Sequence, residues 1–363
     1  MHLDQLRSSL ESLDQARGLL HGWGLRDLER GWHNLTHLAN LLGLDALREL
    51  GQSLGRLLPR CPDPDMALNN LERFLANPAG ARQLPALLDG RSRILETLLQ
   101  LLSTSQYCSD ALIINPDFID MLRVPLRHSP SKQEMQDQLQ AEIDAAFEDS
   151  AVLRAFRRFR QRQILRIGTN DIIRDRPLEE ITRDISRVAD AALGAALTTA
   201  LRHLGNRFGQ PHTASGQPAK CVILAFGKHG GKELNYSSDI DLMFVFDEDG
   251  NTRGQRVAKV SNDEFYGRVV SEVVRLLSAH TEQGQAYRID LRLRPEGHRG
   301  ALARSLASET PEEIRRVEEL HQAVNNGTLQ ASNQETAARL VEEALHSQPV
   351  PARPGAEGPP SPT

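Results

Sequence analysis

The segment Cys221–Asp247 reads CVILAFGKHGGKELNYSSDIDLMFVFD and decides the fold of this chain. Its first run, Cys221–Phe226, is apolar and short enough for a buried strand, and Gly227 follows where the chain must turn tightly. A second apolar run begins at Asp239. Because side chains alternate along a strand, Asp239 and Asp241 are expected to lie on one face of a sheet. The pattern predicts two strands joined through a glycine turn, with a carboxylate pair on the second.

Two carboxylates on one strand face repel each other unless a cation lies between them. Hard oxygen ligands of this kind suit Mg²⁺, which commonly shares its coordination shell with substrate phosphates. A third carboxylate would complete a two-metal clamp for phosphoryl or nucleotidyl transfer. Asp290 is the candidate, because the alternating run Ala286–Arg294 is expected to form a strand beside the first. The predicted catalytic and metal-binding residues are therefore Asp239, Asp241 and Asp290.

The glycine turn and the basic strand supply candidates for holding a nucleotide. Backbone N–H groups can approach phosphate closely where side chains are absent. Strand alternation would place three arginines, Arg288, Arg292 and Arg294, on the face of Asp290, where a phosphate would lie. The predicted nucleotide- and phosphate-binding residues are Gly227, Lys228, Gly230, Gly231, Ser238, Arg292 and Arg294.

Structural roles stay open for all of these residues. The aspartates could be solvated acids at the edge of a loop, the lysine a solvated turn residue, and the arginines members of surface ion pairs. The glycines could serve close backbone packing, and the serine could act as a cap. His229 is expected to be solvated rather than to be a ligand.

The wording of the motif resembles a known family. The segment Gly227–Leu242, GKHGGKELNYSSDIDL, with Leu291–Gly297, LRLRPEG, closely resembles the glutamine synthetase adenylyltransferase/adenylyl-removing enzymes, whose catalytic domains are polymerase-beta-type nucleotidyltransferases. The helical segment around Leu153–Arg160 resembles the family as well. The resemblance spans roughly Cys108 to Leu306.

This resemblance implies a function. The family carries an N-terminal domain that removes AMP from a glutamine synthetase tyrosine by phosphorolysis and a C-terminal domain that adds AMP from ATP. The form ELNYSSDID at Glu233–Asp241 resembles the N-terminal version. The expected activity is Mg²⁺-dependent removal of AMP from adenylylated glutamine synthetase, with phosphate consumed and ADP released.

Two alternatives stay open beside this activity. One is ATP-dependent adenylylation of glutamine synthetase or another protein, and the other is an inactive fragment that only binds glutamine synthetase. Glutamine synthetase is the partner that the resemblance implies, with a PII-type signalling protein as a further partner of full-length members.

The sequence departs from the family pattern at two places in the turn and again after Ala307. Ala225 stands where the family usually has glycine, and His229 where it usually has leucine. Neither change removes an expected metal ligand, so both affect the geometry of the turn rather than the chemistry. Residues 308–363 read as unrelated polar sequence. The chain is therefore expected to be a fragment or an interrupted gene.

Composition narrows the protein class. With 363 residues, 39% hydrophobic and 25% charged, the chain can bury a sizeable core and hold two domains. A net charge of -5 argues against general nucleic-acid binding. No apolar run approaches the roughly 20 residues that span a bilayer. The 3 cysteines are unclustered, which fits a reducing compartment and predicts a cytoplasmic protein. Together with the net charge and the absence of a spanning run, this predicts a protein without nucleic-acid or membrane partners.

The predicted fold class is α+β. Leucines at three- and four-residue intervals predict a helical N-terminal region over 1–205. A nucleotidyltransferase catalytic domain with a mixed sheet and flanking helices is expected over 206–307, entered through a polar linker at Gly205–Lys220. Within it, Ser261 is expected to cap a helix that crosses between the two carboxylate-bearing strands. A divergent helical extension (308–346) and a disordered Pro-rich tail (347–363) complete the prediction.

Overall fold

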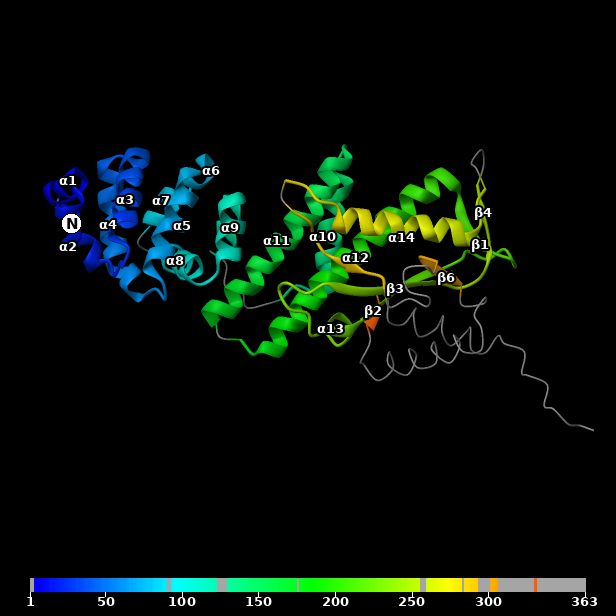
Figure 1. The fold of residues 1–363 in the computed structure, drawn as a ribbon. Coiled ribbons are helices and arrows are strands. Elements are labelled where there is room, and N and C mark those ends of the chain that lie inside the picture. The colour runs from blue at the N-terminus through cyan, green and yellow to red at the C-terminus, as the bar shows by residue number, and fades with distance from the viewer. Residues whose placement is uncertain are drawn as a thin grey trace, which may run out of the picture. The chain divides into compact units, whose positions relative to one another are not determined.

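Helices make up the first part of the chain, and a mixed sheet with flanking helices follows them (Figure 1). The computed structural model describes residues 3–89, 93–122, 129–174, 176–254, 259–282, 284–292, 301–305 and 330–331. The predicted α+β class is confirmed. Contacts divide the chain into a first unit, Met1–Met135 with Arg157–Val188, and a second unit, Gln136–Phe156 with Ala189–Thr363. The predicted domain boundaries stay a prediction.

The first unit is built from short amphipathic helices around a leucine-rich core. Leu38, Leu54, Leu71 and Leu98, from four different helices, are all fully buried in it. The helices that precede residue 123 are α1 (Leu3–Glu11), α2 (Leu13–Gly22), α3 (Leu28–Leu42), α4 (Leu44–Leu57), α5 (Pro64–Ala76), α6 (Pro78–Ala81), α7 (Leu84–Leu88), α8 (Ile94–Thr104) and α9 (Gln106–Ile114), with 3-10 helices at Leu58–Arg60 and Pro116–Leu122.

Side-chain caps mark the starts of five of these helices, α2, α3, α5, α6 and α9. Asp63 accepts a hydrogen bond from the Met66 backbone N–H at 2.9 Å, and Pro64 occupies the first position of α5. Asn77 ends α5 and caps α6, which begins at Pro78. The Asn77 side chain accepts from the Ala79 N–H at 2.9 Å and so nucleates a short helix.

Three more helices follow: α10 (Lys132–Asp144), α11 (Asp149–Arg174) and α12 (Leu178–Phe208). They agree with the predicted helical character of the chain up to about residue 205. None of the helices in the described residues is both long and apolar enough to cross a membrane.

The second unit contains two sheets. In the larger one, β2 (Cys221–Phe226) pairs antiparallel with β3 (Ile240–Phe246) on one side and with β7 (Gln330–Ala331) on the other. The free edge of β3 is shared by β5 (Ile289–Asp290) and β6 (Ala303–Ser305), both parallel to it. In the smaller sheet, β1 (Gln210–Thr213) pairs antiparallel with β4 (Gly250–Arg253). Within the predicted helical extension 308–346, only the two residues of β7 are described, and they form a strand.

The predicted linker at Gly205–Lys220 is wrong. Helix α12 continues to Phe208, Gly209 ends it with a φ of 82°, and β1 begins at the next residue. An alanine Cβ at Gly209 would lie 2.4 Å from the Arg253 carbonyl oxygen, so the turn brings the backbone of β1 directly against that of β4. Polar residues can form a strand here because one face of such a sheet can stay in water, and in β1 Gln210 is exposed whereas Pro211 and Thr213 are buried.

Helix α14 (Asn262–Ser278) confirms the predicted crossover helix. The Ser261 hydroxyl oxygen accepts from the Glu264 backbone N–H at 3.2 Å, as expected for the N-cap. The ring of Tyr266 stacks on Phe246 of β3 with centroids 4.9 Å apart. Because β3 and β5 run parallel, a crossover of this kind is what allows them to become neighbours.

Replacing Ser261 with alanine is expected to lower the free energy of unfolding by about 1 kcal/mol, because one N–H of the first turn loses its acceptor. Urea denaturation followed by circular dichroism measures this. Ser271→Ala is the matched control, since its exposed hydroxyl bonds only to the Gly267 carbonyl within the same helix. Equal losses in the two variants would contradict the capping role.

Candidate active site

Strand pairing brings the three predicted aspartates to the amino-terminal end of β3. Asp241 is the second residue of β3 and lies opposite Asp290 of β5 in parallel register. Asp239 directly precedes the strand. On the other side, Phe226 at the end of β2 lies opposite Asp241. The predicted pairing of the Asp290 strand beside the Asp239–Asp241 strand is thus confirmed.

The carboxyl group of Asp241 has a raised pKa. Burial raises the pKa of its carboxyl, and the carboxylates of Asp290 and Asp239 raise it further, whereas Arg292 and His229 act in the opposite direction. Like charges that perturb one another in this way lie close in space. The arrangement therefore favours a cationic group among the three carboxylates.

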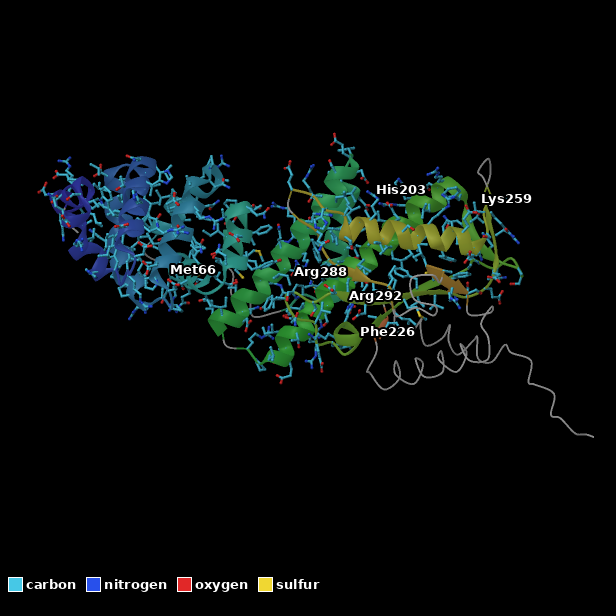
Figure 2. The ribbon with its side chains drawn as sticks, viewed as in Figure 1. Met66, His203, Phe226, Lys259, Arg288 and Arg292 are labelled. Carbon is cyan, nitrogen blue, oxygen red and sulfur yellow. The ribbon has the colours of Figure 1, made fainter. Side chains whose placement is uncertain are left out.

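Two arginines contact the outer aspartates, and both are labelled in Figure 2. Arg292 donates from Nε to the Asp290 carboxylate oxygens at 3.0 and 2.7 Å. Arg288 contacts the Asp239 carboxylate and donates from Nη2 to the Ser237 carbonyl at 3.0 Å. Arg288 was not among the predicted phosphate-binding residues. The alternating pattern placed it on the same strand face as Arg292, which could have indicated a similar role.

The three aspartates are close, but their side chains do not converge as a ready ligand set. Among the residues that the structure describes, no group of three acidic, histidine or cysteine side chains is placed to hold a metal ion. Carboxylate oxygens are nonetheless the ligand chemistry that Mg²⁺ takes in proteins. Metal binding by Asp239, Asp241 and Asp290 stays a prediction.

The run Ala286–Arg294 is not one long strand, so that prediction is wrong. Only Ile289 and Asp290 form β5. The Asp290 carboxylate accepts a hydrogen bond from the Arg292 backbone N–H at 2.8 Å, which turns the chain and removes that N–H from the ladder. Arg294 lies outside the described residues.

The predicted glycine turn forms the short helix α13 (Gly227–Gly230) directly beside Asp241. Gly227 has a φ of 56°, and a Cβ there would lie 2.8 Å from the Asp241 Oδ2. The positive φ favours glycine at this position, and a Cβ would fit only if the Asp241 carboxylate rotated away. Lys228 and Gly231 are exposed, whereas Gly230 is buried. Their contact with a nucleotide stays a prediction.

Ser238 is held by a neighbour that the motif analysis missed. Its hydroxyl donates to the Asn235 Oδ1 at 2.5 Å, and the Asn235 backbone N–H donates back to the Ser238 Oγ at 3.4 Å. Asn235 also accepts from the Ser237 N–H at 3.3 Å. An asparagine inside a loop that precedes a strand is typical of such side-chain turns and could have indicated it.

His229 is buried, so its predicted exposure to solvent is wrong. The side chain is 0% exposed, and Nε2 lies 2.8 Å from Asp190 Oδ1 on α12. The pattern of α13 gave no signal for this pairing, because the partner lies 39 residues earlier in the sequence.

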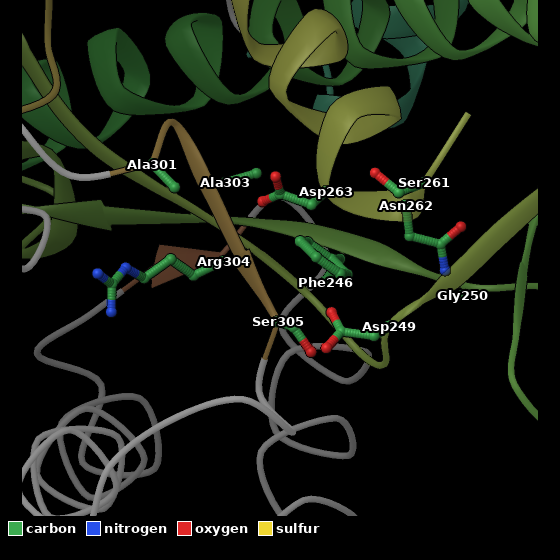
Figure 3. A pocket seen from close by; sticks show the side chains of 10 residues that line it. All are labelled: Phe246, Asp249, Gly250, Ser261, Asn262, Asp263, Ala301, Ala303, Arg304 and Ser305. Atoms are coloured by element: carbon green, nitrogen blue, oxygen red, sulfur yellow. The ribbon is translucent and has the colours of Figure 1, made fainter.

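A cavity of about 460 Å³ lies at the other end of β3, away from the aspartates. Figure 3 shows Phe246 between Asp249 and Asp263 in this view. Its lining is Phe246, Asp249, Gly250, Ser261, Asn262, Asp263, Ala301, Ala303, Arg304 and Ser305. Since Asp241 and Phe246 are five residues apart on one strand, this cavity lies about 17 Å from the carboxylate cluster. The predicted catalytic residues therefore do not line it.

Comparison with known proteins agrees with the motif. The family model for glutamate-ammonia ligase adenylyltransferase matches residues 95–311, more than half of the chain. The bifunctional glutamine synthetase adenylyltransferase/adenylyl-removing enzyme of Pseudomonas aeruginosa is 40% identical over 182 residues, 50% of this chain and 18% of that protein.

Two further relatives carry the same name. The enzyme of Shewanella frigidimarina is 34% identical over 212 residues, 58% of this chain and 22% of its own. That of Hahella chejuensis is 32% identical over 229 residues, 62% of this chain and 24% of its own. The matched region thus spans about a fifth of the length of these relatives. On the match of the family model, the chain belongs to the glutamate-ammonia ligase adenylyltransferase family.

Proposed function

We propose that this chain is a nucleotidyltransferase that removes AMP from the modified tyrosine of adenylylated glutamine synthetase by phosphorolysis. The observation that carries the proposal is the register of β3 and β5, which sets Asp241 opposite Asp290 with Asp239 just outside the strand and the glycine turn beside them. Family membership supports the substrate. The ELNYSSDID form of the motif supports the deadenylylating direction.

In the proposed reaction an oxygen of inorganic phosphate attacks the phosphorus of the tyrosine-bound AMP. The bond from that phosphorus to the tyrosine oxygen breaks, the tyrosine oxygen takes up a proton, and the new P–O–P linkage leaves as ADP. Asp239, Asp241 and Asp290 would hold Mg²⁺, which when bound neutralises charge on the phosphoryl oxygens. Positioning and charge neutralisation supply most of the rate in such transfers.

The residues around the aspartates would orient the phosphates. Because Gly227, Gly230 and Gly231 carry no side chain, a phosphate can approach the backbone of the turn closely, although the Gly231 N–H is itself held by the Gly227 carbonyl. Arg292 and Arg288 lie beside the carboxylates and can pair with phosphate oxygens through two N–H groups each. Lys228 is exposed at the same turn, and its ammonium can approach a phosphate.

The test is mass spectrometry of adenylylated glutamine synthetase incubated with the purified chain, Mg²⁺ and phosphate, with EDTA in a parallel reaction. Loss of AMP with formation of an equal amount of ADP, abolished by EDTA, is the expected result. No loss of AMP from a folded chain would contradict the proposed activity.

The same assay separates the two alternatives. Transfer of AMP from ATP onto unmodified glutamine synthetase would show the adenylylating direction instead. Binding to glutamine synthetase without any nucleotide chemistry would identify a domain that acts only as a partner. We further propose a cytoplasmic location, on the grounds that Cys61, Cys108 and Cys221 are all free thiols.

A further inference from the structure

His229 forms a buried polar pair with Asp190 next to the proposed active site. The His229 side chain is 0% exposed and that of Asp190 is 10% exposed, and their Nε2 and Oδ1 atoms are 2.8 Å apart. Two ionisable side chains removed from water in this way cost free energy unless they satisfy each other. The pair is therefore unlike an exposed ion pair, which contributes little.

The two residues join different elements of the second unit. Asp190 lies on α12, where its neighbours Ala189, Ala191 and Ala192 are fully or almost fully buried. His229 lies on α13, between the exposed Lys228 and the buried Gly230. The hydrogen bond thus ties the glycine turn to helix α12.

The turn that His229 anchors is conformationally strained. Lys232 has a φ of 61°, a left-handed conformation that a residue with a side chain rarely adopts. Its backbone N–H donates to the carbonyl oxygen of His229 itself at 3.0 Å. Conformations of this kind persist only where the surrounding structure holds them. His229 therefore fixes the strained residue through its backbone and the helix through its side chain.

The same turn determines where Asp241 can lie. Gly227 begins α13, and its Cα approaches Asp241 so closely that a Cβ would lie 2.8 Å from Oδ2. The Gly231 N–H donates to the Gly227 carbonyl at 3.0 Å, which closes the turn. His229 and Gly227 belong to this one closed turn, so the position of His229 bears on how closely Gly227 approaches the Asp241 carboxylate.

We propose that the His229–Asp190 pair is a positioning device that holds the nucleotide-binding turn in register with Asp241. This inference rests on the proposed function, because it assigns the pair to the phosphate side of that same site. His229 touches no reacting atom in this role. Its contribution is to keep the turn, and Gly227 in particular, in place beside the Asp241 carboxylate, where phosphate would bind.

The test measures the Kd of ADP with Mg²⁺ by isothermal titration calorimetry for the full chain and two matched variants. In His229→Gln the side-chain amide nitrogen reaches about as far as the histidine Nε2 and can still donate to Asp190. In His229→Asn the amide is one carbon shorter and cannot. We expect the Kd of ADP with Mg²⁺ to be roughly 10- to 100-fold higher for the asparagine variant than for the wild type. This is the range seen when a residue that orients metal ligands is replaced. The glutamine variant is expected to restore binding to near the wild-type value.

A second pair of variants tests the partner. Asp190→Asn keeps an acceptor oxygen for His229, whereas Asp190→Leu removes it. If the two residues act as one device, Asp190→Leu combined with His229→Asn weakens ADP binding no more than either change alone. Circular dichroism and thermal melting of every variant show whether it is folded at the temperature of the titration.

The outcomes separate the two proposals. If the wild-type chain binds no ADP with Mg²⁺, the proposed function fails and the inference fails with it. If the wild type binds and folded His229→Asn binds equally well, the proposed function stands and the positioning role is overturned. Equal losses in the asparagine and glutamine variants would also overturn it, since the reach of the donor would then be irrelevant.

Discussion

Replacing Asp241 with asparagine is expected to lower the rate of AMP removal by about 10²- to 10³-fold or more, the scale for removing a group that stabilises transition-state charge. Asp241 lies between the other two carboxylates, opposite Asp290 and one residue after Ile240, so its loss removes the centre of the cluster. The measurement is ADP release from adenylylated glutamine synthetase at saturating Mg²⁺ and phosphate.

The stability of the same variant is expected to move in the opposite direction. The pKa of Asp241 is raised in the folded state, chiefly by burial, so the folded chain binds its proton more tightly than the unfolded chain does. Ionisation therefore opposes folding, and wild-type stability falls as the pH rises from 3.8, the ordinary value, through the folded pKa. The asparagine side chain of the variant carries no charge, so at neutral pH the variant should be at least as stable as the wild type, and the difference should disappear in acid.

Asp249→Asn is the matched control for both effects. Asp249 is an exposed aspartate at the far end of β3, and it lines the cavity there rather than the carboxylate cluster. Unchanged ADP release in this variant would localise the effect to the amino-terminal end of the strand. Full activity of Asp241→Asn would remove the carboxylate from the mechanism.

Replacing Gly227 with alanine is expected to weaken binding of ADP with Mg²⁺ about 10-fold or more while lowering the free energy of unfolding by only about 1 to 2 kcal/mol. The stability loss comes from the φ of 56°, which disfavours any residue with a Cβ. The binding loss comes from the new methyl group, 2.8 Å from the Asp241 Oδ2. That carboxylate can rotate away at little cost, but it then leaves the position from which it would hold the metal.

Calorimetry and urea denaturation on the same preparation distinguish the two losses. Gly267→Ala is the control, because Gly267 lies within α14 with nothing within 4 Å of a Cβ built there. That substitution should raise stability slightly through helix propensity and leave nucleotide binding unchanged. Wild-type affinity in Gly227→Ala would show that the close approach to Asp241 has no functional meaning.

Local signals predicted much of the part of the fold that carries the site. The apolar runs on either side of the glycine turn became β2 and β3, and Ser261 caps α14 as expected. The pairing of Asp290 beside Asp241 also followed from the alternating pattern. These successes share a cause, because strand alternation and helix capping act over a few residues and are written directly in the sequence.

The wrong predictions involve contacts that local patterns cannot encode. The strand expected over Ala286–Arg294 stops at Asp290, where the Asp290 carboxylate accepts the Arg292 N–H and so takes that donor away from the ladder. The polar segment after Gly209 forms a strand because β4, far along the chain, is a partner for it. Each of the two segments could have been strand or loop by composition. The Arg292 N–H bond to a side chain ended the first as a strand, and pairing with the distant β4 made the second one.

The sequence by itself determined the class of the fold, the family, the two central strands and the pairing of Asp290 beside Asp241. Only the tertiary structure decided that Arg288 and Arg292 contact the outer aspartates and that Gly227 lies against Asp241. It alone buried His229 against Asp190 on α12. The physical reason is that hydrogen-bond periodicity is local to a segment, whereas burial of a charged side chain depends on which distant partner the packed core brings within about 3 Å of it.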